Sequence, residues 1–459
     1  MQSGGLDGLN GLLDMAEGLA ARQVASEQDL ILELNGIYRA LFTIDFAGFD
    51  IAAVRRDAPR LADELFLLGL ALRRRIPEWH AQGCMTRAAQ VALRDVFRAA
   101  RYAHELLGEI ALGHPRRAPD EPVRAAFSGP ASYTDLNPDF ASTGVTFEPG
   151  DVILQRGMAH NSAAIARIGD VDSQFSHVAM VARDPGGELV VVEAVIEDGS
   201  VVVPLQQALE HGIGRAILFR HRNRALAEAA ADLIRNDVLR ADGTIAPRML
   251  YDFSMELPVY DQLFCAKLVR LAYAMASDGR FVIPTYPTLL AMRNRDFISR
   301  IGVTAMETFA PADMELETDF DIVAEWRDYR VSSELRLKDM IMTKLFEWME
   351  VQGYRFRPTF GIHLASRLGW LSARMPASIQ RVATRFTGAR VPPNMTTSAI
   401  GAVAMLHATG EKLYARLKEL EDKSIRDTGR QLHPRQVLQH LEAMRGGMGR
   451  KIGYLVEGD

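Results

Sequence analysis

Two apolar runs separated by a turn occupy residues 176–195, which have the sequence SHVAMVARDPGGELVVVEAV. Both runs are rich in valine and other residues that favour strands. The tetrapeptide between them, Asp184-Pro185-Gly186-Gly187, is a strong turn signal, because proline fixes φ and glycine accepts conformations that other residues avoid. We therefore predict two antiparallel strands, 176–182 and 189–195, joined as a β-hairpin.

Further strands and helices are expected before and after this hairpin. Short apolar runs bounded by turn residues predict strands, and apolar residues three and four positions apart predict helices. The strands are expected at 150–155, 215–220 and 320–326, and the helices at 225–238 and 265–276. Because strands and helices mix without strict alternation, we predict an α+β domain and place it at residues 129–331.

The regions on either side of this domain have a helical pattern. Apolar residues recur at helical spacing at 30–42, 61–72 and 88–107, and again at 338–351 and 400–420. Five prolines between residues 114 and 138 mark a linker after the first of these regions. We therefore predict an N-terminal helical region at 1–128 and a C-terminal helical region at 332–459.

The composition is that of a folded soluble protein. Of the 459 residues, 48% are hydrophobic and 24% are charged, which excludes disorder as the dominant state. Lys and Arg number 53 against 58 Asp and Glu, so the formal net charge is −5. Nucleic-acid binding needs concentrated positive charge, so we do not expect a nucleic-acid partner.

The two cysteines, Cys84 and Cys265, are too few for a disulfide scaffold or a Cys-rich metal site. We also find no spacing of histidines and carboxylates typical of a metal site, and expect no metal and no cofactor. No window resembles a membrane span, and the first residues, MQSGGLD, contain no basic residue typical of a signal peptide. We therefore expect a cytoplasmic protein, while secretion by a route without such a peptide stays open.

Cys265 stands where the helix 265–276 is expected to begin. With Asp261 as the predicted N-cap, the thiol would lie in the first turn, where the helix dipole favours a thiolate. A thiolate in this position is typical of an activated cysteine nucleophile. The alternative is that Cys265 is a small residue of an apolar core.

His177 and Glu193 each interrupt an apolar strand of the predicted hairpin. A carboxylate in so apolar a run is costly unless it is paired. If the hairpin forms, Glu193 can reach the imidazole of His177, fix its tautomer and stabilise the imidazolium. The alternatives are a hydrogen-bonded core histidine and a glutamate at an exposed edge.

These segments resemble a known family, the circularly permuted papain-like cysteine hydrolases of the YiiX/YaeF-like branch of the NlpC-type superfamily. The resemblance covers about residues 146–329. It lies in the segments GDVILQR at 150–156, FSHVAMV at 175–181, VEA at 192–194, YDF at 251–253 and FCAKLV at 264–269. It implies a permuted papain-like domain, an antiparallel sheet plus helices, between the two helical regions.

The resemblance also implies roles for individual residues. The family order is histidine, then a polar third member, then cysteine, which assigns catalysis to His177, Glu193 and Cys265. It suggests Tyr251, and after it Gln155, as oxyanion or substrate-binding groups. Many relatives continue Cys-Ser-Glu, whereas this chain has Cys265-Ala266-Lys267, so Lys267 either lowers the pKa of the cysteine further or marks a different substrate.

The expected function is that of a thiol-dependent hydrolase, an amidase, peptidase or esterase, which works through a thioester acyl-enzyme. An acyltransferase acting on a lipid or protein, and a non-catalytic scaffold on an inactive papain-like core, are the alternatives. The expected partner is an amide- or ester-containing substrate, a peptide or a lipid. Residues 375–459 contain 13 Lys and Arg against 8 Asp and Glu, so the basic C-terminal helices are a further candidate for peripheral membrane contact.

Overall fold

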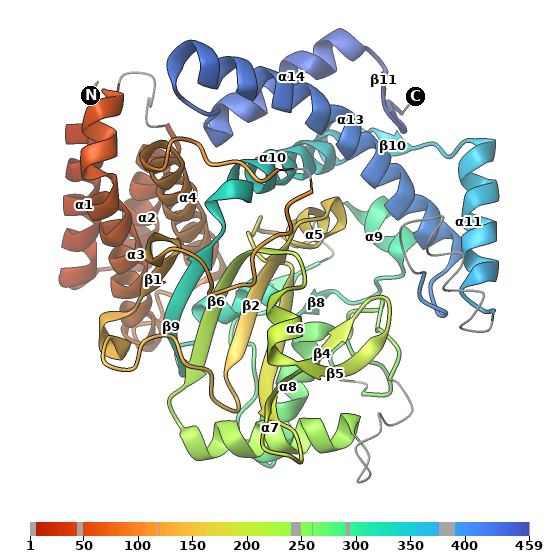
Figure 1. Cartoon of the computed structure of the whole chain (residues 1–459), viewed down its shortest axis with the longest axis horizontal. Helices are drawn as coiled ribbons and strands as arrows, with labels where there is room; N and C mark the ends of the chain where they lie inside the picture. The colour runs from red at the N-terminus through yellow and green to blue at the C-terminus, as the bar shows by residue number, and fades with distance from the viewer. Residues whose placement is uncertain are drawn as a thin grey trace.

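The computed structural model describes residues 6–43, 49–118, 120–239, 249–258, 260–290, 294–375 and 391–458. A seven-stranded antiparallel sheet lies at its centre, between a bundle of N-terminal helices and a set of C-terminal helices (Figure 1). The predicted α+β domain with helical flanks is therefore confirmed. The predicted boundaries at 128 and 331 stay predictions, since the sheet begins at Thr134 and ends at Arg327.

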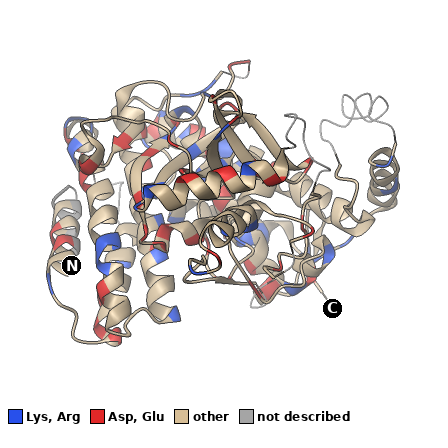
Figure 2. Cartoon of the chain, turned by 90° about the horizontal axis from the view of Figure 1, so that it is seen from below, with Lys and Arg blue, Asp and Glu red and all other residues tan. Residues whose placement is uncertain are grey.

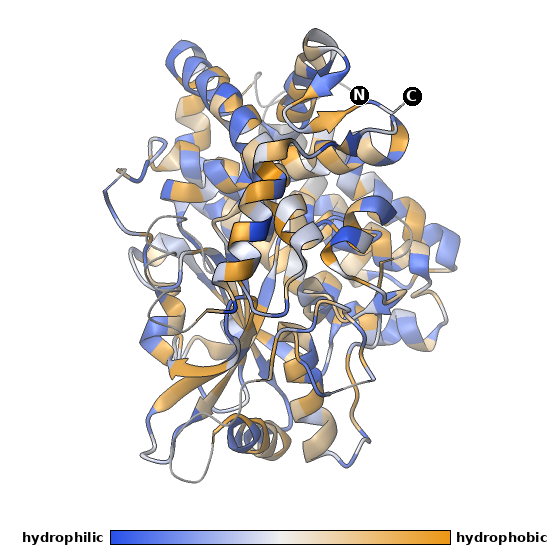
Figure 3. Cartoon of the chain, turned by 90° about the vertical axis from the view of Figure 1, so that its right-hand side faces the viewer, coloured by the Kyte–Doolittle hydropathy of each residue, from blue (hydrophilic) through white to orange (hydrophobic). Residues whose placement is uncertain are grey.

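The strand order in the sheet is β1-β9-β6-β2-β3-β4-β5. The bounds are β1 Thr134–Leu136, β2 Val152–Gly157, β3 His177–Arg183, β4 Leu189–Val195, β5 Gly199–Pro204, β6 Ile213–His221 and β9 Phe320–Arg327. Strands β3 and β4 pair antiparallel, with Met180 opposite Val192 and Arg183 opposite Leu189. The hairpin predicted from the turn at Asp184 is thus present, and its strands are mostly hydrophobic (Figure 3).

Two helices cover one face of this sheet. Helix α7, Arg224–Val238, and helix α8, Cys265–Ala276, share a hydrophobic core with the side chains of β2, β3 and β4 that point to them. Helix α6, Leu205–Leu209, and apolar residues between 125 and 147 cover the other face. Because both faces are covered, these strands are apolar at almost every position rather than at alternate positions.

The start of β2 explains one segment of the family resemblance. Gly150 has φ of +85°, and a Cβ there would lie 2.4 Å from the carbonyl oxygen of Ala227, so only glycine fits. Its own carbonyl accepts a hydrogen bond of 2.8 Å from the Tyr273 hydroxyl of α8. Asp151 is fully buried and accepts two hydrogen bonds from Arg220 of β6, at 2.9 and 2.7 Å. The segment therefore ties β2 to α8 and β6.

The N-terminal region folds as four helices with their own apolar core. They are α1 Leu6–Ala21, α2 Glu27–Thr43, α3 Ile51–Ala81 and α4 Arg87–Ala111. Side-chain caps fix two of the starts, since Asp50 accepts from the Ala52 N–H and Thr86 accepts from the Ala89 N–H. The predicted helical character of this region is confirmed.

The C-terminal region is helical but also contains strands that the sequence pattern did not predict. Its helices are α10 Tyr329–Val351, α11 Phe360–Ser372, α13 Thr397–Thr428 and α14 Pro434–Met448. Three two-residue strands, β10 Arg355–Phe356, β11 Lys451–Ile452 and β12 Leu455–Val456, form a small sheet. A run of two residues cannot show the alternation of apolar and polar side chains that marks a strand, so these strands could not be predicted from the sequence. Elsewhere, the short elements are η2 Ala131–Tyr133, η3 Pro138–Phe140, α5 His160–Ile165, β7 Thr288–Leu289, α9 Arg295–Ile301, β8 Glu307–Thr308 and η4 Pro311–Leu316.

A buried cluster of charges joins the three parts of the chain. Asp339 of α10 is fully buried and lies 2.7 Å from Arg156 of β2 and 3.1 Å from both Arg167 and Arg215. Arg215 of β6 also pairs with Glu105 of α4. In the cartoon of Figure 2, acidic and basic residues are interspersed along the helices and loops. None of the described helices is both long enough and apolar enough to span a bilayer.

Candidate active site

Cys265 is the first residue of α8, as the sequence predicted, but the cap differs. The N-cap is Phe264, which offers no side-chain acceptor, so the prediction of Asp261 as N-cap is wrong. The helix begins too far along the chain for Asp261 to be the residue that flanks it. The first helical hydrogen bond runs from the Leu268 N–H to the Phe264 carbonyl, at 3.0 Å. The helix therefore leaves the amide of Cys265 unused, next to a thiol that is 4% exposed.

His177 lies at the start of β3 and connects the sulfur to a carboxylate. Its Nε2 is 2.6 Å from Oε2 of Glu193, and its side chain also hydrogen-bonds to Cys265. Burial lowers the pKa of His177, but the hydrogen bonds to Cys265 and Glu193 outweigh this and raise the pKa to about 10. About a fifth of the imidazole side chain, 21%, remains exposed.

Glu193 lies on β4, where the β3–β4 hairpin brings it against His177. Burial raises the pKa of Glu193, but the hydrogen bond and charge of His177 overcome that effect and leave it below the usual value of 4.5. The carboxylate is therefore ionised at neutral pH and faces a proton held on the imidazole. The structure brings Cys265, His177 and Glu193 together from three separate elements.

Lys267, where the family resemblance was weakest, does not have a free ammonium group. It is fully buried, and its Nζ lies 2.6 Å from Oδ2 of Asp252. The ammonium also lies 5.7 Å from the ring centre of Tyr260 and 5.9 Å from that of Phe264. Its charge is thus neutralised by Asp252 and anchors the loop that precedes α8.

Tyr251 and Gln155, the two predicted oxyanion or substrate-binding residues, both lie near the three side chains. Tyr251 is buried, and burial together with the nearby Cys265 raises the pKa of its hydroxyl well above 10, so the hydroxyl keeps its proton. Gln155 is paired with His177 across β2 and β3, is 5% exposed, and its Nε2 has no hydrogen-bond partner among the described residues. Both residues can therefore donate a hydrogen bond to an incoming group.

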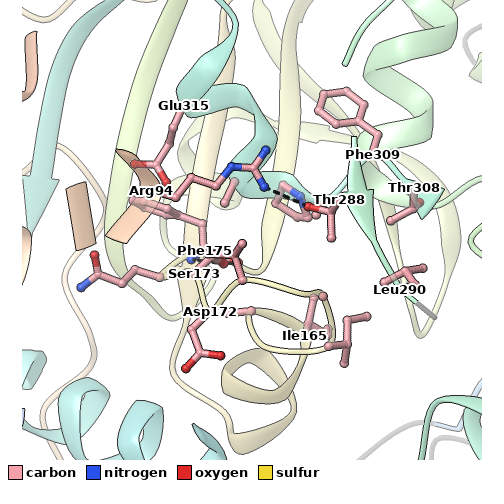
Figure 4. A pocket seen from close by; sticks show the side chains of 18 of the residues that line it. Arg94, Ile165, Asp172, Ser173, Phe175, Thr288, Leu290, Thr308, Phe309 and Glu315 are labelled. Carbon is pink, nitrogen blue, oxygen red and sulfur yellow. Dashed lines mark hydrogen bonds between the residues drawn. The ribbon is translucent and has the colours of Figure 1, made fainter. Parts of the chain in front are cut away.

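Cys265 and Tyr251 also line a narrow, partly open pocket with a cavity volume of about 40 Å³ (Figure 4). Its other walls come from α4, the segment 165–175, strands β7 and β8 and the start of η4. The arginines Arg94, Arg98 and Arg101 of α4 belong to the wall. A helix of the N-terminal region therefore completes the space beside the thiol.

Two features of this site were missed from the sequence. The three arginines of α4 recur at four- and three-residue spacing, so helical periodicity offered a signal for a shared face. Asn394 donates a hydrogen bond of 2.8 Å from Nδ2 to the backbone oxygen of Tyr251, which joins the C-terminal region to the site. A single asparagine after two prolines gave no such signal.

Within the described part of the chain, no group of three or more His, Cys, Asp or Glu side chains could hold a metal ion. The groups around Cys265 are a histidine that holds a proton, a carboxylate that stabilises the charged ring, and hydrogen-bond donors from a helix start and a tyrosine. This is the arrangement of an acyl-transfer site.

Comparison with known proteins gives one match, to a family model. A family model described as permuted papain-like amidase enzyme, YaeF/YiiX, C92 family, matches residues 146–320 and leaves both helical regions unmatched. No curated protein and no solved structure matches the chain. The matched range contains the three side chains that meet at the start of α8, so residues 146–320 are similar to the enzyme family of permuted papain-like amidases.

Proposed function

We propose that this protein is a thiol-dependent hydrolase of amide or ester bonds, with Cys265 as nucleophile, His177 as general base and Glu193 as the residue that orients the imidazole. The observation that supports this most directly is the continuous contact from sulfur to imidazole to carboxylate. If Cys265 were only a core thiol, His177 an isolated histidine and Glu193 an edge residue, the three side chains would have no reason to meet in this order of sulfur, imidazole and carboxylate.

The proposed reaction begins with transfer of the Cys265 proton to His177. Since Nε2 faces Glu193, Nδ1 is the nitrogen that accepts it. The sulfur then attacks the substrate carbonyl, and the oxyanion is held by the Cys265 N–H and the Tyr251 hydroxyl. The carbon–nitrogen or carbon–oxygen bond breaks as the imidazolium protonates the leaving group, which leaves a thioester on Cys265.

The second half of the reaction decides between hydrolase and acyltransferase. His177 removes a proton from water, the resulting oxygen attacks the thioester, and the free acid leaves as the sulfur takes back its proton. An alcohol or amine in place of water would make the same site an acyltransferase. The residues around Cys265 serve both outcomes, and the proposal is that water is the usual acceptor, in keeping with the amidase description of the family.

Alkylation by iodoacetamide tests the proposal, because the chain contains its own control. Cys84 and Cys265 are 6% and 4% exposed, so access alone predicts equal rates. We expect Cys265 to be modified much faster than Cys84 at about pH 6, and expect His177→Ala to remove this advantage. Intact-mass analysis with Cys265→Ala and Cys84→Ala variants assigns each adduct. Slow and equal labelling of both thiols would favour the scaffold alternative.

A further inference from the structure

The pocket beside Cys265 has a lining whose exposed surface is mostly hydrocarbon. Its apolar side chains come from segments far apart in the chain and include Ile165, Ile168, Phe175, Leu290 and Phe309. Figure 4 shows several of these side chains around the same space, with Arg94 donating a hydrogen bond to Thr288 at 3.3 Å. A lining of this kind suits an apolar ligand with few polar groups.

The arginines in the wall do not make the pocket a site for anions, because each is paired. Arg94 lies 2.9 Å from Asp313, Arg98 lies 2.6 Å from Asp95, and Arg101 lies 2.7 Å from both Glu315 and Glu325. Arg98 also lies 3.7 Å from Asp172, so three guanidinium groups meet five carboxylates. A charged ligand would have to separate a buried ion pair, which costs several kcal/mol.

Some hydrogen-bond donors in the wall are nevertheless unused. Gln174 is 1% exposed, and its Nε2 has no partner among the described residues, although its Oε1 accepts a hydrogen bond from Arg101. Arg94 is 6% exposed and its Nε is likewise without an acceptor there. A ligand that fits this pocket is therefore uncharged, largely apolar, and able to accept a hydrogen bond.

Resting on the proposed function, we infer that this pocket binds the acyl part of the substrate, and that the acyl part is an uncharged apolar chain rather than a charged peptide segment. The acyl carbon must come to the sulfur of Cys265, and that residue is part of the pocket lining. Helix α4 forms part of the wall, so the N-terminal region takes part in substrate selection.

N-alkyl iodoacetamides of increasing chain length test this without knowledge of the natural substrate. In each case the thiolate forms a carbon–sulfur bond and displaces iodide, so only the alkyl chain varies. We expect the rate at Cys265 to rise about two- to fourfold for each of the first few buried methylenes, so that the N-butyl reagent reacts about tenfold faster than iodoacetamide. Cys84 should show no such dependence.

A substitution in the pocket wall, with a matched control, tests whether the alkyl chain of the reagent lies in the pocket. Ala310 lines the pocket and is partly exposed, so Ala310→Phe fills the lumen without displacing a packed core. We expect it to bring the ratio of N-butyl to iodoacetamide rates close to one, and expect Ala229→Phe, on the exposed face of α7, to leave that ratio high. An unreactive Cys265 would refute the proposed function. A reactive Cys265 with no dependence on chain length, or with a ratio unchanged by Ala310→Phe, would refute the pocket.

A second inference rests on helix α11, which lies beside α13 at the edge of the molecule in Figure 1 and on the side facing the viewer in Figure 3. Ser366 and Gly369 turn toward α13, since a Cβ on Gly401 would lie 3.1 Å from Oγ of Ser366 and one on Gly369 would lie 3.7 Å from Ile400. Small residues and Ile362 thus occupy the packed face, and the other large apolar residues of α11 include several that are exposed.

The outward face is an apolar stripe. Its residues and exposed fractions are Phe360 83%, Leu364 49%, Leu368 58%, Leu371 48% and Met375 42%. Their spacing of four, four, three and four residues puts them on one side of a helix. Exposed apolar groups of this size, gathered in one place, mark an interaction surface rather than ordinary surface variation.

The charge around the stripe indicates what covers it. Residues 351–375 contain four arginines, Arg355, Arg357, Arg367 and Arg374, and no Asp, Glu or Lys. Arg374 lies over the ring of Trp370 at 3.8 Å, so its stem runs along the helix beside the stripe. An apolar face bordered by arginines is typical of a helix that lies in the interface of an anionic bilayer.

We propose that α11 docks this protein on an anionic membrane surface. Sedimentation with phosphatidylcholine vesicles, with and without phosphatidylglycerol, tests it. We expect binding only when phosphatidylglycerol is present, weakened by salt, and reduced at least about tenfold by the double change Leu364→Glu and Leu368→Glu, since both the apolar area and the charge balance are lost. The control is Leu67→Glu on α3, an exposed leucine far along the chain from the stripe.

Two results would refute the membrane proposal. One is binding that ignores the anionic lipid or survives the double change. The other is self-association through the stripe. In that case sedimentation velocity would show a dimer that the double change converts to a monomer, and neither form would bind vesicles.

Discussion

Nε2 of His177 lies 2.6 Å from Oε2 of Glu193. The two residues are 16 positions apart in the chain, and they meet because a short turn folds β3 and β4 together. The carboxylate thus holds the ring through Nε2 and leaves Nδ1 for the sulfur in the proposed mechanism. This leaves the ring one orientation in which it can serve Cys265.

Glu193→Gln should keep the shape of this contact and remove its charge. Without the carboxylate the imidazolium is less stable, so we expect the rate of Cys265 alkylation near neutral pH to fall about tenfold or more. Iodoacetamide kinetics measure this change. Glu188→Gln, in the exposed turn of the same hairpin, is the control and should react like the wild type. An unchanged rate in Glu193→Gln would exclude the assigned role.

Tyr251→Phe separates oxyanion stabilisation from thiol activation. The hydroxyl is needed only when a carbonyl oxygen becomes charged, so we expect hydrolysis of a p-nitrophenyl ester to slow about 100-fold. Alkylation of Cys265 forms no oxyanion and should continue at the wild-type rate. The matched change Tyr260→Phe affects a half-exposed ring in the same loop. Equal loss of both reactions in Tyr251→Phe would show that the hydroxyl instead positions the thiol.

The raised pKa of His177 predicts how stability depends on pH. Folding raises the pKa from 6.5 to about 10, so the folded state binds this proton more tightly than the unfolded state. The resulting stabilisation is complete below about pH 6.5 and is lost as the pH rises through about 10. Urea unfolding of the wild type and of His177→Gln measures it. The difference between their free energies of unfolding should shrink between these two pH values, and a constant difference would contradict the shift.

Asp339 should be among the least replaceable carboxylates of the described chain. Burial alone would raise its pKa, but Arg156, Arg167 and Arg215 hold that pKa well below the usual range. Asp339→Asn would leave three buried guanidinium groups with a deficit of negative charge, and we expect the free energy of unfolding to fall by about 3–5 kcal/mol.

The control for that change is an exposed pair. Asp321 lies 2.8 Å from Arg222 with 36% of its side chain exposed, so Asp321→Asn should cost less than about 1 kcal/mol. Urea unfolding of both variants gives the comparison. A similar small cost at both positions would mean that water reaches the cluster around Asp339.

Local sequence patterns predicted the hairpin and the helix that carry the three site residues. The hairpin follows from two valine-rich runs and the turn at Asp184, and the helix that begins at Cys265 follows from its apolar spacing. Together they put Glu193 beside His177. The contact between His177 and Cys265 joins residues far apart in the chain, and the family resemblance rather than periodicity suggested it.

The remaining features depend on contacts that no local pattern contains. Asp261 seemed a good cap, but tertiary packing starts the helix at Cys265 with Phe264 before it. Lys267 finds its partner, Asp252, in an irregular loop. Basic runs in amphipathic helices usually face water, yet Arg73 and Arg101 are buried here against carbonyl and carboxylate groups from the sheet domain. Their burial is decided by the surface that packs on them, which lies hundreds of residues away.

The position of Asp339 in the chain has a consequence for biosynthesis. Strands β2 and β6 are made well before helix α10, so Arg156 leaves the ribosome without its carboxylate, whereas Arg215 already has Glu105 of α4. Until residue 339 follows, the nascent sheet would have to bury an uncompensated cation, which is unfavourable. The charge balance of this buried cluster is therefore completed only after α10 has been synthesised, and a nascent chain that ends before α10 lacks it.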